Sequence, residues 1–478
     1  MAESAELFHT PAGVAFADVS INGHRETLQV RHKTFRQWLT HAFYRSTLRA
    51  PGSGSLQAAI CTIEAKAQFT GAERPVNIRI GGSDNCVYID LGDKSWRAIE
   101  VDDASWRVIN KPLVRFRRAP GMQSWPTPMR GGSIELLRPF LNLQSDDDFV
   151  MAVAFVLAAL RDRGPYPVLV LSGEQGAAKS TFVAVVRALI DPNTAPLRAL
   201  PRHERDLFIA AGNSYVQAFD NVSNIPPWLS DALCRLATGG SLSTRQLRTD
   251  QDEVLLTATR PMILNGIENC VLRPDLADRC IFLNLEHIPD DRRRAEKEFW
   301  DAFELRRPYI LGALLDAMAH GLERLPETRL ETLPRMADFA VWLTACETAL
   351  WPAGTFSGAY DANRATAIDD VIDADPVAMA VCELMALKPA WKGTATDLLA
   401  ALNALVGKQS KLPTTWPGTP RALSGRLRRF QTILRKIGID IAFSKDGHAR
   451  MRLITILKRD ELKAVRNRPH RLHRPQIG

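Results

Sequence analysis

The stretch PVLVLSGEQGAAKSTFVAVVRALI, at residues 167–190, decides the fold of the central part of the chain. It begins with a short apolar run between Pro167 and Gly173, which is typical of a strand buried on both faces of a parallel sheet. It ends with a helical pattern over residues 182–190. The loop between them is rich in glycine, and such a loop before a helix presents backbone N–H groups and the positive helix end to a phosphate. The stretch therefore predicts a phosphate-binding loop between a strand and a helix.

This loop carries the residue types that bind a nucleoside triphosphate. We expect Lys179 to reach the terminal phosphates of ATP and the hydroxyl of Ser180 to ligate Mg²⁺. Ala178 departs from the usual pattern, which has glycine, and its methyl group would crowd the phosphate if the backbone needs a positive φ there. A chance glycine turn is the alternative, but it does not account for the motifs that follow. The residues predicted to bind ATP are Gly173, Glu174, Gln175, Gly176, Ala177, Ala178, Lys179, Ser180 and Thr181.

Two further apolar runs end in polar residues suited to the same site. SYVQAFD, at residues 214–220, ends in Asp220, which we predict to hold the hydration shell of the magnesium ion. The next position usually holds a glutamate that prepares the attacking water, but here it is Asn221. An amide can position water but cannot accept its proton, so we expect slow hydrolysis or another base, of which Asp220 is the nearest. TRPMILNG, at residues 259–266, contains Asn265, which we predict to sense the γ-phosphate.

Arg279 precedes the next apolar run, CIFLNL. From the start of that run its guanidinium could reach ATP held by a neighbouring subunit, and an arginine supplied in this way accelerates phosphoryl transfer by roughly 10³ to 10⁵ in related settings. The alternative is an intramolecular ion pair with Asp275 or Asp278. Arg273 is the second candidate for the catalytic role.

With these motifs in order, residues 145–290 resemble superfamily III helicases of the AAA+ class, especially phage-type and poxvirus-type primase-helicases and ATP-binding proteins of mobile elements. The most telling segment is LATGGSLSTRQLRTDQD, at residues 236–252, which looks like the hairpin that lines the pore of these helicases. The resemblance implies that Arg245 and Arg248 contact the backbone of single-stranded DNA. Alternatively, Arg245 reaches a nucleotide phosphate or braces the hairpin. The resemblance also implies a homo-oligomeric ring, usually a hexamer, that moves along DNA when ATP is hydrolysed.

The region before this core looks like an α+β domain over residues 1–118. Helical patterns precede short strands that are separated by turn clusters such as GGSDN. The expected helices cover residues 33–48 and 56–69. Residues 119–144 begin with APGMQSWPTPMRGGS, whose prolines and glycines are typical of a linker.

Beyond the core, we predict a helical region at residues 291–384 and a winged-helix-like domain at residues 385–459. In the latter, two helices precede a hairpin, and the second helix carries a row of cations that would lie near DNA. A purely structural domain, with these cations facing solvent or acids, is the alternative. The residues of this helix predicted to lie near DNA are Arg421, Arg426, Arg428, Arg429, Arg435 and Lys436.

The positive charge is concentrated at one end of the chain. Residues 421–478 hold 16 Lys and Arg against four acidic residues, and residues 460–478 form a basic tail. Such a segment favours a polyanionic partner, although a tail that only improves solubility is the alternative. The longest apolar run, residues 149–160, is much shorter than the roughly 20 residues of a membrane span, and the N-terminus lacks the pattern of a secretory signal. These features predict a cytoplasmic protein that does not enter membranes, and the scattered cysteines argue against zinc sites and disulfides.

Together, the patterns predict an α/β multidomain protein: an α+β N-terminal domain, an AAA+ P-loop core with a parallel sheet, and a C-terminal helical and winged-helix-like domain. The first functional hypothesis is an ATP-dependent DNA helicase or translocase that replicates a phage or mobile element and acts on single-stranded or forked DNA. The second is an ATP-dependent DNA-binding switch or scaffold without unwinding. Asn221 favours the second hypothesis and the hairpin favours the first. A primase needs clustered acids for two metals, and only Asp90 and Asp93 lie close together, so a primase is expected on a separate chain.

Overall fold

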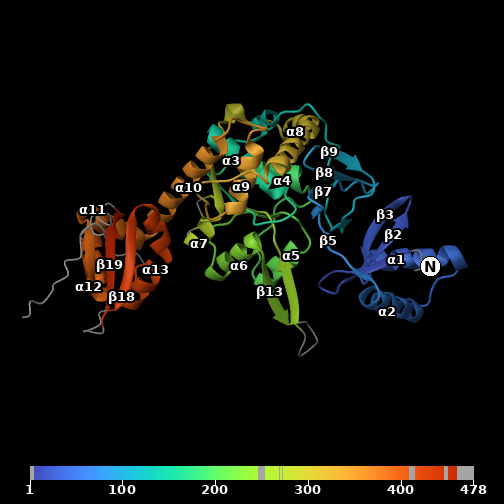
Figure 1. Ribbon diagram of the computed structural model, residues 1–478, viewed down its shortest axis with the longest axis horizontal. Helices are drawn as coiled ribbons and strands as arrows, with labels where there is room; N and C mark the ends of the chain where they lie inside the picture. The colour runs from blue at the N-terminus through green and yellow to red at the C-terminus, as the bar shows by residue number, and fades with distance from the viewer. Residues whose placement is uncertain are drawn as a thin grey trace, which may run out of the picture. The chain divides into compact units, whose positions relative to one another are not determined.

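The computed structural model describes residues 5–245, 253–267, 270–271, 273–407, 415–445 and 451–459. The chain divides into two compact units (Figure 1). The first comprises residues 1–270 and 279–363, and the second comprises residues 271–278 and 364–478. Among the described residues, no helix is long and apolar enough to cross a membrane.

The first unit begins with a small sheet that has its own core. Strands β1 (Glu6–His9), β2 (Ala15–Ile21), β3 (His24–Gln29) and β4 (Ala72–Glu73) lie in the order β3-β2-β1-β4. Helices α1 (Lys33–Thr47) and α2 (Ser53–Phe69) pack on this sheet, which confirms the two helices predicted for this region. Leu39 and Ile63 are among the residues of its separate hydrophobic cluster. The first three strands were not predicted, because polar residues interrupt their alternation.

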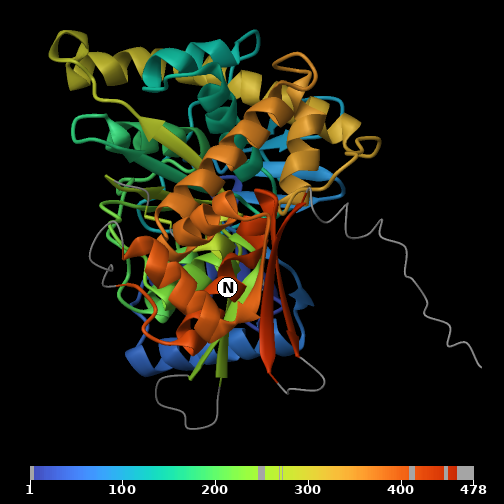
Figure 2. The ribbon, with the colours of Figure 1, turned by 90° about the vertical axis from the view of Figure 1, so that its left-hand side faces the viewer.

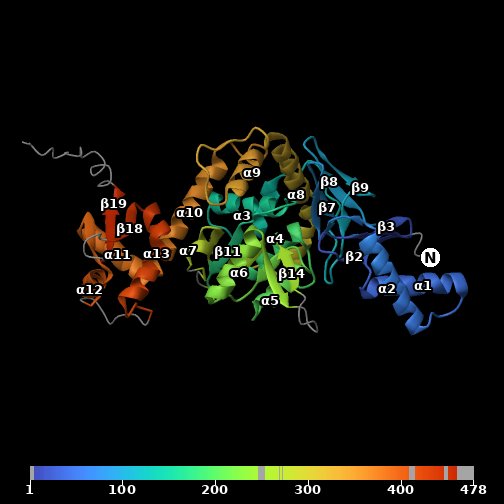
Figure 3. The same cartoon turned by 60° about the horizontal axis from the view of Figure 1, so that its bottom comes forward.

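A second sheet follows, and it belongs to the central core. Strands β6 (Ile80–Ser83), β7 (Cys86–Asp90), β8 (Ala98–Val101) and β9 (Trp106–Ile109) form an antiparallel meander, and β5 (Val76–Asn77) pairs with β10 (Arg115–Phe116). Ile89 and Ile99 of this sheet are fully buried in the same hydrophobic cluster as the central helices. Helix α8 (Glu296–Arg324) lies against β8 and β9 (Figure 3). Residues 1–118 are therefore not one independent domain, because the second sheet belongs to the hydrophobic core of the central region.

Residues 119–144 are not the linker that their composition predicts. The backbone N–H of Trp125 donates to Leu91 O at 2.8 Å, and that of Met129 donates to Pro308 O at 2.9 Å. A side chain on Gly312 would place its Cβ 1.9 Å from Met129 O, so only glycine allows this close approach. The 3₁₀ helix η2 (Ile134–Phe140) then buries Ile134, Leu137 and Phe140. The prolines and glycines of this segment build an extended strap that packs along the core.

The centre of the first unit is a parallel sheet. Its strands are β11 (Val168–Gly173), β12 (Gln217–Phe219), β15 (Met262–Asn265) and β16 (Cys280–Leu285), in the order β12-β15-β11-β16. The surrounding helices are α3 (Asp146–Ala159), α4 (Lys179–Ile190), α5 (Glu204–Ala211), α6 (Pro227–Thr238) and α9 (Ala337–Glu347). The strand and the helix predicted on either side of the glycine-rich loop are both present.

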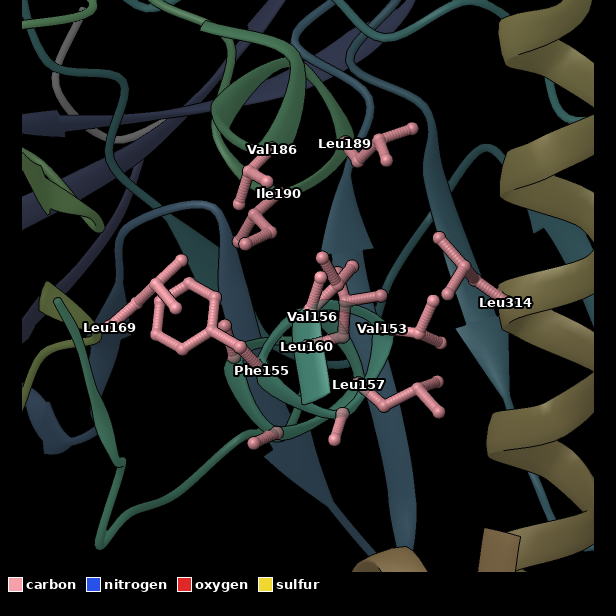
Figure 4. Packing of buried hydrophobic residues seen from close by; sticks show 14 of the residues in the cluster. Val153, Phe155, Val156, Leu157, Leu160, Leu169, Val186, Leu189, Ile190 and Leu314 are labelled. Carbon is pink, nitrogen blue, oxygen red and sulfur yellow. The ribbon is translucent and has the colours of Figure 1, made fainter. Parts of the chain in front are cut away.

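Helix α3 is the centre of the hydrophobic core. It begins at Ser145, whose hydroxyl accepts a hydrogen bond of 3.1 Å from the N–H of Asp148, as the sequence predicts. All residues from Phe149 to Ala159 are buried. Figure 4 shows Phe155 and Val156 of this helix, and Leu160 at its C-cap, within a layer completed by β11, α4 and α8. The labelled members from these elements are Leu169, Val186, Leu189, Ile190 and Leu314. This layer anchors the strand and the helix on either side of the glycine-rich loop.

A hairpin extends from the core between α6 and β15. Strands β13 (Gly240–Arg245) and β14 (Glu253–Ala258) pair in antiparallel register from Gly240 with Ala258 to Arg245 with Glu253 (Figure 1). This confirms the hairpin predicted between the run that ends in Asp220 and the run that contains Asn265. The tip, residues 246–252, lies outside the described part of the chain.

The second unit has the element order of a winged helix. Helices α11 (Pro376–Leu387), α12 (Ala395–Val406) and α13 (Pro420–Lys436) pack together, and strands β17 (Ala390–Thr394), β18 (Ile439–Lys445) and β19 (Arg452–Lys458) form a sheet in the order β17-β19-β18. Figure 2 shows the β18–β19 hairpin along its length. The predicted boundary at residue 385 is too late, because α11 packs on α12 and α13. The unit also includes α7 (Pro274–Ala277), and α10 (Thr355–Asp373) crosses the boundary between the units.

Candidate functional site

The glycine-rich loop joins the end of β11 to the start of α4. Gly173 has φ 148°, and a Cβ at this position would lie 2.2 Å from Leu285 O on the neighbouring strand, so the loop cannot turn here with any other residue. Ala178 has φ 58° and ψ 30° immediately before α4. This is the left-handed conformation in which glycine is the usual residue, and alanine adopts it at a cost of about 1–2 kcal/mol. Ala178, which stands where the usual pattern has glycine, therefore occupies a position that needs a positive φ.

Lys179 is the first residue of α4, and its side chain forms hydrogen bonds with the backbone of the preceding loop. Its Nζ donates to Gly173 O at 2.7 Å and to Glu174 O at 2.8 Å. Burial lowers the pKa of Lys179, and the negative charge of Asp220 opposes that shift. The Lys179 ammonium group thus interacts electrostatically with the Asp220 carboxylate, although Lys179 begins a helix and Asp220 follows a strand. Ser180 is exposed beside Lys179, and Thr181 is half-buried.

Asp220 follows β12, and Asn265 is the last residue of the adjacent strand β15. Asn265 Nδ2 donates to Asp220 Oδ1 at 2.6 Å, and the backbone N–H of Asn221 donates to the same oxygen at 3.0 Å. Asn265 is only 2% exposed, and its Oδ1 accepts no hydrogen bond from the described residues. A buried acceptor without a donor is costly unless a bound group supplies one. The amide therefore offers a polar contact to a molecule at this edge of the sheet.

These side chains meet at one edge because the four strands are parallel. The carboxyl ends of β11, β12 and β15 lie together, which is where ligands bind in open α/β sheets. The structure thus brings Lys179, Asp220 and Asn265 into one site, while Asn221 is exposed beside it with φ 53°.

The donor set at this edge fits a magnesium ion. The Ser180 hydroxyl and the Asp220 carboxylate are hard oxygen ligands, and Mg²⁺ in nucleotide sites typically uses one or two protein oxygens and completes its shell with phosphates and water. The described residues include no group of three or more His, Cys, Asp or Glu that would hold a metal without such help.

Three residues that the sequence did not single out also contact the loop. Asn142 Nδ2 donates to Ala177 O at 3.2 Å and to Glu286 O at 2.7 Å. His287 Nδ1 lies 3.3 Å from Gln175 O, and the Arg293 guanidinium lies next to Gly176. Only the run of arginines at residues 292–294 could have drawn attention to this segment in the sequence.

Arg279 lies at the opposite side of the sheet from the loop, at the amino ends of the parallel strands. The backbone N–H of Val168, the first residue of β11, donates to Arg279 O at 2.9 Å, whereas the phosphate loop leaves β11 at Gly173. At about 3.3 Å per residue, these two positions are about 17 Å apart. The backbone of Arg279 is therefore too far from the loop of its own chain for its side chain to reach ATP bound there. Of the acids named as alternative partners, Asp275 lies 3.8 Å from Arg273 and Asp278 pairs with Lys436.

The predicted DNA contacts divide into two groups. Arg245 ends β13, but its side chain and all of Arg248 lie outside the described residues. On α13, Arg421, Arg428 and Arg429 are exposed, and the Arg428 guanidinium lies 4.2 Å from the ring centre of Phe443. The remaining predicted residues are engaged with acids: Arg426 with Asp375 at 2.6 Å, Arg435 with Asp440 at 2.8 Å, and Lys436 with Asp278. For Arg426, which is partly buried, this geometry favours the structural alternative.

Comparison with known proteins places the chain in a family. No curated protein matches it. Solved structures that resemble it include apo forms of the NrS-1 C terminal region: one covers 95% of this chain and 97% of that chain at 10% identity with a TM-score of 0.42, and another covers 95% and 96% at 10% identity with a TM-score of 0.38. The family model for the actinomycete integrative conjugative element replication protein matches residues 134–374, and that for the AICE RepA C-terminal domain matches residues 377–468. Because these matches span well over half of the sequence, the chain belongs to the family of replication proteins of actinomycete integrative conjugative elements.

Proposed function

We propose that this replication protein binds ATP with Mg²⁺ at the carboxyl edge of its central sheet and uses ATP hydrolysis to move along and unwind DNA. The observation that carries the proposal is the convergence of Lys179, Asp220 and Asn265 on one side of a glycine-rich loop. A loop with these residues fits a triphosphate better than any other common ligand, because it combines a cation, backbone N–H groups and oxygen ligands for a metal. In this proposal the core is a P-loop ATPase of the superfamily III type.

Each residue at the site has a role in this proposal. The N–H groups of residues 174–181 surround the phosphates, and Lys179 exchanges its two carbonyl partners for phosphate oxygens. Ser180 and Asp220 hold the magnesium ion, which neutralises charge on the phosphates when it is bound. The free Oδ1 of Asn265 faces a bound water or ligand group, while its Nδ2 fixes the Asp220 carboxylate.

The site is poorly equipped with a general base. Asn221 carries an amide, which cannot accept a proton, and Asp220 Oδ1 already accepts two hydrogen bonds. We therefore propose that intrinsic hydrolysis is slow and that Arg279 of a neighbouring subunit accelerates it. A role between subunits also accounts for the position of Arg279 at the amino ends of the strands, far from the loop of its own chain.

The DNA-binding elements of the proposal are the β13–β14 hairpin, with Arg245 and Arg248, and the exposed arginines of α13. The partner is single-stranded or forked DNA within a homo-oligomeric ring, for which a hexamer is the expected state. A primase would come from a separate chain, because Asp90 is held by Arg118 at 2.7 Å and Asp93 by Arg97 at 2.6 Å, so neither carboxylate is available for metals.

An ATP-dependent DNA-binding switch without unwinding is the second candidate, and Asn221 favours it. The deciding experiment is a strand-displacement assay on forked DNA, combined with measurement of phosphate release with and without single-stranded DNA. Unwinding that disappears in Lys179→Ala supports the helicase. ATP-dependent DNA binding without displacement supports the switch, and no measurable phosphate release with DNA present would refute the helicase.

A further inference from the structure

The segment that follows β16 is fastened to the phosphate loop. Asn142 Nδ2 donates to a carbonyl oxygen on each side, Ala177 O in the loop and Glu286 O in the segment. His287 Nδ1 lies 3.3 Å from Gln175 O. A carbonyl oxygen can only accept, so His287 must carry its proton on Nδ1 for this bond to form. Residues 286–293 are thereby held beside the loop by two side chains.

Arg293 lies at the end of this segment. A Cβ built on Gly176 would be 3.4 Å from Arg293 Nη2 and 3.2 Å from His287 Nδ1, so the guanidinium lies close to the middle of the loop. The partner of Arg293 in the structure is Asp290, at 3.2 Å, and the two side chains are 53% and 89% exposed. An exposed pair of this kind contributes only about 0–1 kcal/mol, so it can be exchanged for a stronger partner.

We propose that Arg293 is a second phosphate-binding cation of the site and acts in the same chain as Lys179. This inference rests on the proposed function, because it assumes that the loop holds a nucleotide. When the phosphates occupy the loop, the guanidinium leaves Asp290 and donates to phosphate oxygens, for which its planar pair of N–H groups is well suited. Lys179 then binds from the helix side and Arg293 from the segment after β16. His287 and Asn142 position Arg293 by holding its segment against the loop.

The chain supplies matched controls for this assignment. Arg292 and Arg294 are exposed neighbours with the same charge, and neither supplies one of the three atoms nearest to a Cβ built on Gly176, as Arg293 does. If Arg293 acts only through general electrostatic attraction, the loss of any one of the three arginines should have the same effect. If it contacts the phosphates, only its own loss should matter.

The test is the dissociation constant of ATP and of ADP, measured by calorimetric titration of the full-length protein without DNA. We expect Arg293→Ala to raise the dissociation constant of ATP about 10- to 100-fold, as for the loss of a charge-assisted hydrogen bond, while Arg292→Ala and Arg294→Ala change it less than about 3-fold. Arg293→Lys should restore part of the affinity. Unchanged melting temperatures without nucleotide would show that all the variants fold.

Wild-type affinity in Arg293→Ala, or equal losses in all three alanine variants, would overturn the inference while leaving the ATPase proposal in place. If the wild-type protein and Lys179→Ala bind ATP equally weakly, the proposed function itself fails, and this result is distinct from the first two.

Discussion

Asn265 Nδ2 donates a hydrogen bond of 2.6 Å to Asp220 Oδ1, and the bond links the ends of two adjacent parallel strands. The backbone strengthens the link, because the N–H of Val222 donates to Asn265 O at 2.8 Å. The carboxylate is thus held by an amide that is itself almost fully buried. Replacing that amide by a second carboxylate should be the most informative change of one atom in the site.

Asn265→Asp should abolish magnesium-dependent ATP binding and destabilise the protein by about 1–3 kcal/mol, because two carboxylates would face each other where a hydrogen bond now exists. Repulsion raises the pKa of one carboxyl, so the loss of stability should be largest at neutral pH and should shrink below about pH 5. Urea unfolding at several pH values measures this. Asn284→Asp is the control, because Asn284 is exposed and accepts from Ser172 Oγ at 3.2 Å, a bond that aspartate can retain.

Lys179→Ala should reduce ATP affinity by at least about 100-fold, because the loop loses its partly buried cation. Since burial lowers the pKa of Lys179, wild-type affinity should start to decline as the pH rises toward the ordinary lysine value of about 10, earlier than for an exposed lysine. Fluorescence titration with an ATP analogue between pH 7 and about 10 checks both statements. The exposed Lys94 provides the control, and retained binding in Lys179→Ala would show that the loop is not a phosphate site.

Ala178→Gly should be tolerated or should raise ATP affinity, because glycine adopts φ 58° without the strain that alanine carries. Ala178→Val should lose ATP binding, since a β-branched residue is strongly disfavoured in the left-handed region. Affinity and melting temperature should be measured for both variants. A Val variant that binds ATP as tightly as the wild type would contradict the proposed geometry of the loop.

Arg279→Ala should leave ATP binding unchanged and lower the rate of phosphate release by about 10³-fold or more. The arginine immediately precedes β16, and its backbone lies about 17 Å from the loop of its own chain, so its action requires a neighbour. Mixing Arg279→Ala with Lys179→Ala protein should therefore restore part of the activity, because each mutant supplies what the other lacks. An absence of recovery in mixtures that form oligomers would argue for a role within one chain.

The arginines of α13 should separate into two classes. Arg426→Ala should destabilise the C-terminal unit by about 3 kcal/mol, because it leaves the buried Asp375 carboxylate without its partner. Arg429→Ala should leave stability unchanged, weaken DNA binding and reduce the salt dependence of binding by about one phosphate contact, since Arg429 is exposed. Thermal melts and DNA titrations at several salt concentrations measure the two effects. A loss of DNA affinity in Arg426→Ala without any change in stability would reverse the assignment.

The sequence predicted the elements whose patterns are local. The apolar run before Gly173, the helix after Ser145 and the order of the C-terminal helices follow from periodicity and capping, and each is present. The meeting of Lys179, Asp220 and Asn265 was also predictable, because parallel strands bring their carboxyl ends to one edge.

Other features depend on contacts that no local pattern reveals. Residues 119–144 have the composition of a linker, yet the strap is fixed by backbone bonds to Leu91 and Pro308, which are distant in the sequence. Asn142, His287 and Arg293 are ordinary polar residues until the fold brings them to the loop. The position of Arg426 beside Asp375 likewise arises from packing between α11 and α13, and helical spacing alone cannot distinguish it from its exposed neighbours.

The shared core of the second sheet has a practical consequence for dividing the protein. The family match begins at residue 134, but Ile89 and Ile99 are fully buried against the elements that follow. A fragment trimmed to the matched region would expose this apolar wall to solvent and should aggregate. A cut near residue 75 would remove only a module that carries its own hydrophobic cluster. The family match and the independently folding part of the chain thus begin at different residues, near 134 and near 75 respectively.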